Sequence, residues 1–77
     1  MKRISYTEFI DMLTKESICF INSYEEAVIR TEIVNKELLY YVRFKGEDEF
    51  QAEKGSGIVA GGLEEHSLIT KEEYEQY

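Results

Sequence analysis

Residues 27–45 contain two strand-like runs, AVIRTEIV (27–34) and LLYYVRFK (38–45), with Asn35-Lys36 between them as the candidate turn. Both runs alternate and are rich in β-branched and aromatic residues, which favour strands. A two-residue turn at Asn35-Lys36 places Ile33 opposite Leu38 and Ala27 opposite Phe44, and one face of the pair is then apolar. Because the turn position and the face pattern agree, the sequence predicts an antiparallel hairpin.

A helix is the alternative for the first run. Ser23-Tyr24-Glu25-Glu26 matches a capping box, so a helix over 23–36 could follow it. Five β-branched residues lie between positions 28 and 34, however, and β-branched side chains are restricted in helices. We therefore favour a strand.

The segments around the hairpin complete the predicted fold. Capping boxes that begin at Ser5 and Thr70 predict helices at about 5–16 and 71–77. The run at 18–21 predicts a short strand, and a turn at Gly46-Glu47 leads into a strand at 48–53, with Phe50 and Ala52 facing inward. Four glycines predict a flexible loop over 54–62. The expected fold is α+β in a single domain, 1–77, with an N-terminal helix, a three- to four-stranded antiparallel β-meander and a short C-terminal helix.

The chain has a net charge of −7, and all of that charge lies beyond residue 45. Residues 1–45 have equal numbers of acids and bases, whereas the remainder has nine acids against Lys54 and Lys71. A one-sided charge influences the choice of partner and the encounter rate rather than the fold. We expect these acids, together with Tyr74, to form a partner-binding surface made of Glu47, Asp48, Glu49, Glu53, Glu64, Glu65, Glu72, Glu73 and Glu75.

Residues that could carry catalysis or bind a metal are few. Cys19 is the only cysteine and His66 the only histidine, too few for an internal disulfide or a structural zinc site. The glycine-rich segment does not match a phosphate-binding motif. His66 and Ser67 follow two glutamates, but adjacent residues rarely converge as members of a catalytic triad do. We expect no catalytic residues, no metal and no cofactor, and therefore no enzyme.

The basic N-terminus lacks an apolar run after it, and the single thiol suits a reducing compartment, so we expect a cytoplasmic protein. The leading hypothesis is an acidic module for protein–protein interaction that occupies a basic surface of a partner protein, for example a nucleic-acid-binding surface. Such a module would be an inhibitor or DNA mimic, similar in size and charge to those carried by phages and mobile elements. It would bind neither nucleic acid nor membrane directly.

The alternative hypothesis is a small self-associating accessory subunit. Its homodimer would use the outer face of the hairpin, where Val28, Leu39 and Tyr41 lie among Arg30 and Arg43. Apolar residues on an exposed sheet face are a liability in a monomer, which is the reason for expecting a second chain there.

Overall fold

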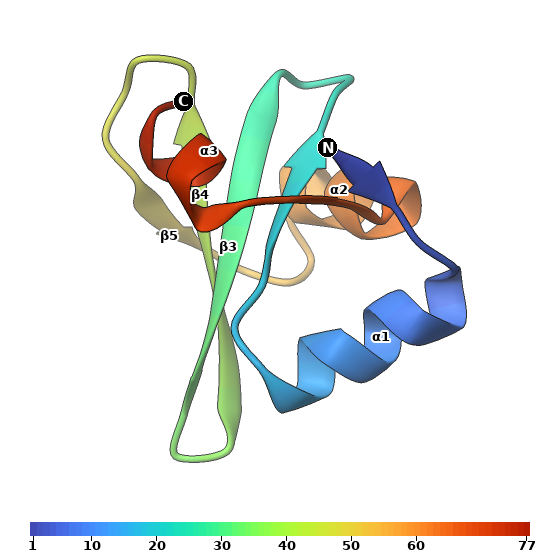
Figure 1. Ribbon diagram of the computed structural model, residues 1–77. Coiled ribbons are helices and arrows are strands. Elements are labelled where there is room, and N and C mark those ends of the chain that lie inside the picture. Colours follow the sequence, from blue (N-terminus) through green and yellow to red (C-terminus); the bar gives the residue numbers. More distant parts are fainter.

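The predicted hairpin forms the centre of the fold (Figure 1). The computed structural model describes residues 1–77, and its strands β3 (Ala27–Val34) and β4 (Glu37–Phe44) pair with Ile33 opposite Leu38. The strand interpretation and the register are confirmed. Asn35 and Lys36 have φ angles of 52° and 66°, as a type I′ turn requires of both central residues.

The sheet has six antiparallel strands, whereas the prediction allowed at most four. Their order is β1-β6-β2-β3-β4-β5. The two extra strands, β1 and β6, have two and three residues, too few to show an alternating pattern in the sequence. The remaining strand bounds are β1 (Lys2–Arg3), β2 (Cys19–Asn22), β5 (Phe50–Ala52) and β6 (Ser67–Ile69).

Both helices predicted from capping boxes are present. Helix α1 (Tyr6–Lys15) begins after Ser5, whose side chain accepts the Glu8 backbone N–H. Helix α3 (Lys71–Glu75) begins after Thr70, and both hydrogen bonds of its capping box are formed.

The prediction of a flexible glycine loop over 54–62 is wrong. Most of that segment belongs to helix α2 (Gly57–Glu65), which begins after Ser56. The glycines allow α2 to approach the sheet closely, because a Cβ added at Gly62 would lie 2.9 Å from a ring carbon of Phe20. Contact with the sheet stabilises a helix that its own composition disfavours.

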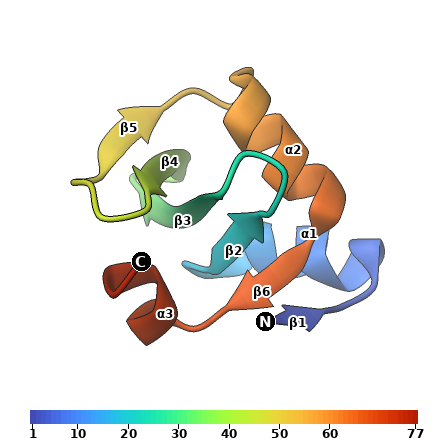
Figure 2. The same ribbon diagram turned by 90° about the horizontal axis from the view of Figure 1, so that it is seen from above.

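The helices cover opposite faces of the sheet (Figure 2). Helices α1 and α2 pack on the inner face and enclose the main core, where the rings of Phe9 and Phe20 meet edge to face with centroids 5.2 Å apart. Helix α3 lies on the outer face. The prediction that Phe50 faces inward is wrong. Because β5 is the edge strand, Phe50 is 43% exposed and stacks on Phe44 at the edge of the sheet.

Candidate functional site

The structure brings only some of the nine acids together. Glu64 and Glu65 belong to α2 on the inner face of the sheet, whereas the three glutamates of α3 lie on the outer face (Figure 2). The acids at 47–49 lie in the connection between β4 and β5, and Glu49 contacts α3 through Tyr74. Glu53 follows β5 at the far edge of the sheet. The acids beyond residue 45 thus fall into separate groups.

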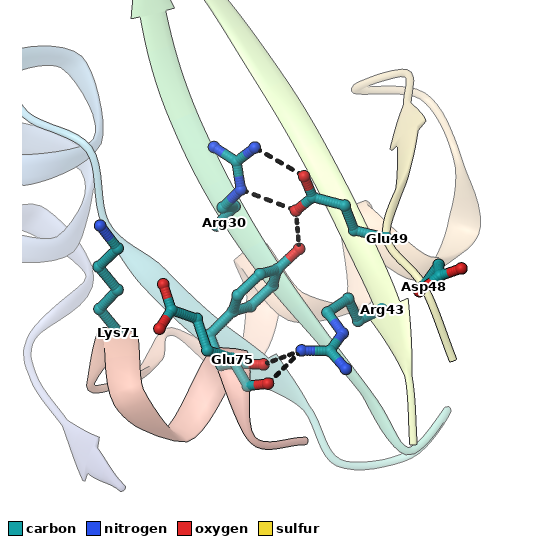
Figure 3. Close-up of a pocket in the computed structure, with 7 residues that line it drawn as sticks. Arg30, Arg43, Asp48, Glu49, Lys71 and Glu75 are labelled. Carbon is teal, nitrogen blue, oxygen red and sulfur yellow. Dashed lines mark hydrogen bonds and ion pairs between the residues drawn. The ribbon is translucent and has the colours of Figure 1, made fainter. Parts of the chain in front are cut away.

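Glu49 is neutralised by a base from the first half of the chain (Figure 3). Its two carboxylate oxygens accept hydrogen bonds from Arg30 Nε and Nη2, each 2.8 Å long, and Tyr74 Oη donates to Oε1 at 2.7 Å. The Arg30 hydrogen bonds lower the pKa of Glu49 to about 2. Burial, followed by the bond to Glu49, raises the pKa of Tyr74. We call this group the Arg30–Glu49–Tyr74 cluster.

Arg43 fixes the same region by binding backbone carbonyls. Its guanidinium donates to the carbonyl oxygens of Glu47, Tyr74 and Glu75. Carbonyls in the last turn of a helix lack partners within the helix. Arg43 satisfies that of Glu75 and adds a second donor to that of Tyr74, which also accepts the Tyr77 backbone N–H at 3.3 Å. The cleft beside Arg43 has a volume of about 510 Å³. The two guanidinium groups that line it, those of Arg30 and Arg43, already donate hydrogen bonds to acceptors of the protein itself. We interpret the cleft as a structural junction that holds α3 on the sheet.

Two other acids have local structural roles. Glu73 closes the capping box of α3, and the hydrogen bond from the Thr70 backbone N–H lowers the pKa of its carboxyl group. Glu65 accepts hydrogen bonds from the backbone N–H and the hydroxyl of Ser23, at 2.7 and 2.6 Å. This second contact joins the end of α2 to the turn between β2 and β3.

The most uniform acidic region lies at that turn. Glu25 from the turn lines a groove with Glu64 and Glu65 from α2, and Glu26 is the next residue of the turn. None of these four glutamates forms an ion pair. Tyr24 is 91% exposed among them. A groove of about 420 Å³ runs between the turn and α2. We call this region the Tyr24 surface; it consists of Tyr24, Glu25, Glu26, Glu64 and Glu65.

Sequence reasoning missed three of the five residues of the Tyr24 surface: Tyr24, Glu25 and Glu26. Glu25 and Glu26 lie in the part of the chain whose charges cancel overall, and only the fold places them next to α2. One signal was available, because Ser23-Tyr24-Glu25-Glu26 follows a short strand and reads equally well as a polar turn. Glu26 indeed adopts a left-handed backbone conformation, with φ 52°, as tight turns often require.

The contacts of Cys19 and His66 are those of residues that support the fold. Cys19 is half-buried on the outer face of the sheet, and burial raises the pKa of its thiol, which disfavours the nucleophilic thiolate. His66 ends α2 in a left-handed conformation with φ 40°. Its Nε2 accepts from Arg3 Nε at 3.4 Å, and its ring packs against Tyr6. No group of three or more metal-ligating side chains comes together anywhere in the chain.

The outer sheet face offers less apolar surface than the alternative hypothesis requires. Val28 is completely buried, and α3 contacts β3 on this side of the sheet. Leu39 and Tyr41 remain half-exposed, and the guanidinium of Arg30 lies 4.1 Å from the centre of the Tyr41 ring. A second chain could therefore reach only the part of this face that lies beyond α3.

None of the helices is both long and apolar enough to cross a bilayer. Comparison with protein-family models, with curated proteins and with solved structures found no match to this chain.

Proposed function

We propose that the protein is a non-enzymatic binding module that docks on a basic surface of a partner protein through the Tyr24 surface. The observation that carries the proposal is the combination of a 91% exposed tyrosine with four surrounding carboxylates that have no basic partner. An aromatic side chain supplies the area that is desolvated at the centre of an interface. Unpaired charges around it accelerate the approach of a partner with the opposite charge.

The backbone of the turn that presents Tyr24 is fixed before binding. Glu65 ties the turn to α2, and the Asn22 side chain donates to the Ile58 carbonyl at 2.9 Å while accepting the Glu25 backbone N–H at 3.1 Å. Asn22 itself is buried. A binding surface that is already ordered loses less conformational entropy on association, which favours affinity.

The acids near α3 are secondary in this proposal. Their charge is offset locally by Arg30, Arg43 and Lys71, which line the same cleft as Asp48 and Glu75. They add to the long-range negative field but offer no uniform acidic surface. Of the nine acids beyond residue 45, the proposed contact region keeps only the two on α2, and it adds the two in the β2–β3 turn.

A nucleic-acid-binding protein is one class of partner with a suitable basic surface. Carboxylates placed there would occupy sites that normally hold phosphates, so binding would inhibit the partner. The inhibitor role and a cytoplasmic location belong to the proposal, and they rest on the charge, the absence of a candidate catalytic group and the single thiol.

The proposal is tested by capture of the partner from lysate with tagged protein at low and high salt. Glu25→Gln combined with Glu64→Gln removes two charges from the Tyr24 surface, and Tyr24→Ala removes its aromatic ring. The matched control, Asp48→Asn combined with Glu72→Gln, removes two charges near α3 and leaves the net charge equal to that of the first variant.

We expect the natural chain to capture a partner at low salt and to lose it at high salt. The Glu25/Glu64 variant and the Tyr24 variant should fail to capture this partner at low salt, whereas the control variant should retain it. Loss of the partner in the control as well as in the Glu25/Glu64 variant would show that only net charge matters. A complex that is insensitive to salt would exclude electrostatic docking altogether.

A further inference from the structure

The two edges of the sheet differ in their chemistry. The strand order places β1 at one edge and β5 at the other, and both lie at the margin of the molecule (Figure 2). Strand β1 consists only of Lys2 and Arg3, and both residues are exposed. Short, charged edge strands discourage pairing with other chains. Strand β5 has the sequence Phe50-Gln51-Ala52 without a charged residue, so its edge lacks this protection.

The backbone of Gln51 points away from the sheet. Residues that flank a two-residue hairpin turn exchange hydrogen bonds, so the odd-numbered residues of β4 bond to β3 and the even-numbered residues bond to β5. Phe50 and Ala52 are the β5 partners of even-numbered residues. Gln51, between them, directs its N–H and C=O to the opposite side, where no strand follows. This edge therefore offers one donor and one acceptor to an incoming strand.

One side of β5 is apolar and accessible. Phe50 is 43% exposed and stacks on Phe44, with ring centroids 5.9 Å apart. Ala52 is partly buried and packs against the main core. Because side chains alternate along a strand, Phe50 and Ala52 share this side, whereas Gln51 faces the other. An incoming strand with apolar residues on this side would cover the exposed part of Phe50.

Acidic side chains lie at both ends of β5. Glu47 precedes the strand by three residues and Glu53 follows it directly. Both are exposed, and neither forms an ion pair. Lys54 is the only base between residues 46 and 54. The charge around this edge therefore favours a basic segment as the incoming strand.

We propose that an extended basic segment of a partner protein pairs with β5 as an additional antiparallel strand. Adding a strand to an open sheet edge is a common way of binding an extended peptide. The segment alternates basic and apolar residues. Its central residue exchanges both backbone hydrogen bonds with Gln51, and its two apolar residues lie beside Phe50 and Ala52. Its terminal basic residues lie near Glu47 and Glu53.

A second copy of the chain fits this edge less well than a basic segment. Antiparallel pairing of two β5 strands about Gln51 would place Glu49 of each copy opposite Glu53 of the other, and like charges in opposite positions are destabilising. The edge is also separate from the Tyr24 surface, because β3 and β4 lie between β2 and β5 in the sheet. The proposal therefore does not rest on the proposed function.

An NMR titration of the isotopically labelled chain tests the proposal. The probe is the acetylated and amidated peptide Lys-Val-Lys-Val-Lys. We expect chemical-shift changes centred on the backbone amides of residues 50–52, with millimolar affinity because the contact is small. The same peptide methylated on its central backbone nitrogen keeps its charge but lacks the N–H, so it should bind about tenfold more weakly. The peptide Lys-Lys-Val-Val-Lys has the same composition without the alternation and should also bind more weakly.

Gln51→Pro probes the same contact from the protein side, with Gln51→Ala as its matched control. Both remove the side-chain amide, but only proline removes the outward N–H, which β4 does not use. We expect the proline variant to bind the peptide about tenfold more weakly than the alanine variant. Tyr24→Ala should bind it as the natural chain does, so this result is distinguishable from failure of the Tyr24 surface.

Equal affinity for the three peptides, or shift changes that are not centred on β5, would overturn the proposal and leave only a general attraction between opposite charges. Shift changes at residues 50–52 that follow the concentration of the chain alone would assign the edge to a second copy instead. The methylated peptide keeps the test decisive if Gln51→Pro fails to fold, because it leaves the protein unchanged.

Discussion

Glu49→Gln tests the Arg30–Glu49–Tyr74 cluster, which links three distant segments of the chain. The carboxylate joins the β4–β5 connection to β3 through two bonds of 2.8 Å and to α3 through one of 2.7 Å. Glutamine keeps the size and shape of the side chain but removes its charge. We expect the variant to fold with a lower free energy of unfolding at neutral pH.

The expected loss follows from the pKa of Glu49. A decrease from 4.5 to about 2 corresponds to about 3 kcal/mol if the full shift is counted. The Glu49 side chain is 35% exposed, so solvent screens the pair, and we expect a loss of about 1–2 kcal/mol. The folded-state pKa lies below the unfolded value. This stabilisation is therefore complete above pH 4.5 and is lost as the pH falls from 4.5 towards 2.

Urea denaturation at a series of pH values measures the effect. The stability difference between the natural chain and Glu49→Gln should be constant near neutrality and should shrink as the medium becomes acidic. Asp48→Asn is the control, because Asp48 is the preceding residue and forms no ion pair. A difference that is the same at pH 7 and pH 3, or one that Asp48→Asn reproduces, would refute the role assigned to the cluster.

Four further substitutions test the packing, a buried hydrogen bond and a helix cap. Gly62→Ala places a Cβ 2.8 Å from a core methyl group, so it should lower the melting temperature and reduce the free energy of unfolding by about 1–3 kcal/mol. In Gly57→Ala the added Cβ meets nothing within 4 Å, so this variant should raise the melting temperature. Thr31→Val removes the hydroxyl that accepts the buried Ile18 N–H at 3.0 Å and should cost about 1–3 kcal/mol in urea denaturation. Thr70→Ala removes the cap of α3; it should cost about 1 kcal/mol in the same assay and speed amide exchange in that helix.

The acidic surface shows where sequence reasoning failed for the candidate site. Charge counted along the chain placed every functional acid beyond residue 45, yet Glu49 is paired with Arg30, 19 residues earlier. Conversely, Glu25 belongs to a segment without net charge and lies at the most uniform acidic region. Which charges meet is decided by contacts between distant segments, and a running count of charge along the chain contains no information about them.

The sequence alone determined the hairpin, its register and the two capped helices. In each of these the interacting residues are close in the chain: Asn35-Lys36 sets the pairing of the strands it joins, and Ser5 and Thr70 bond to amides three residues later. The tertiary structure alone decided α2, β1 and β6. Gly61 and Gly62 lie in a helix because the sheet accepts their close approach, and β6 exists because β1 and β2 lie on either side of it. Local hydrogen bonds and periodicity are present in a short segment, whereas packing against a surface appears only when that surface has formed.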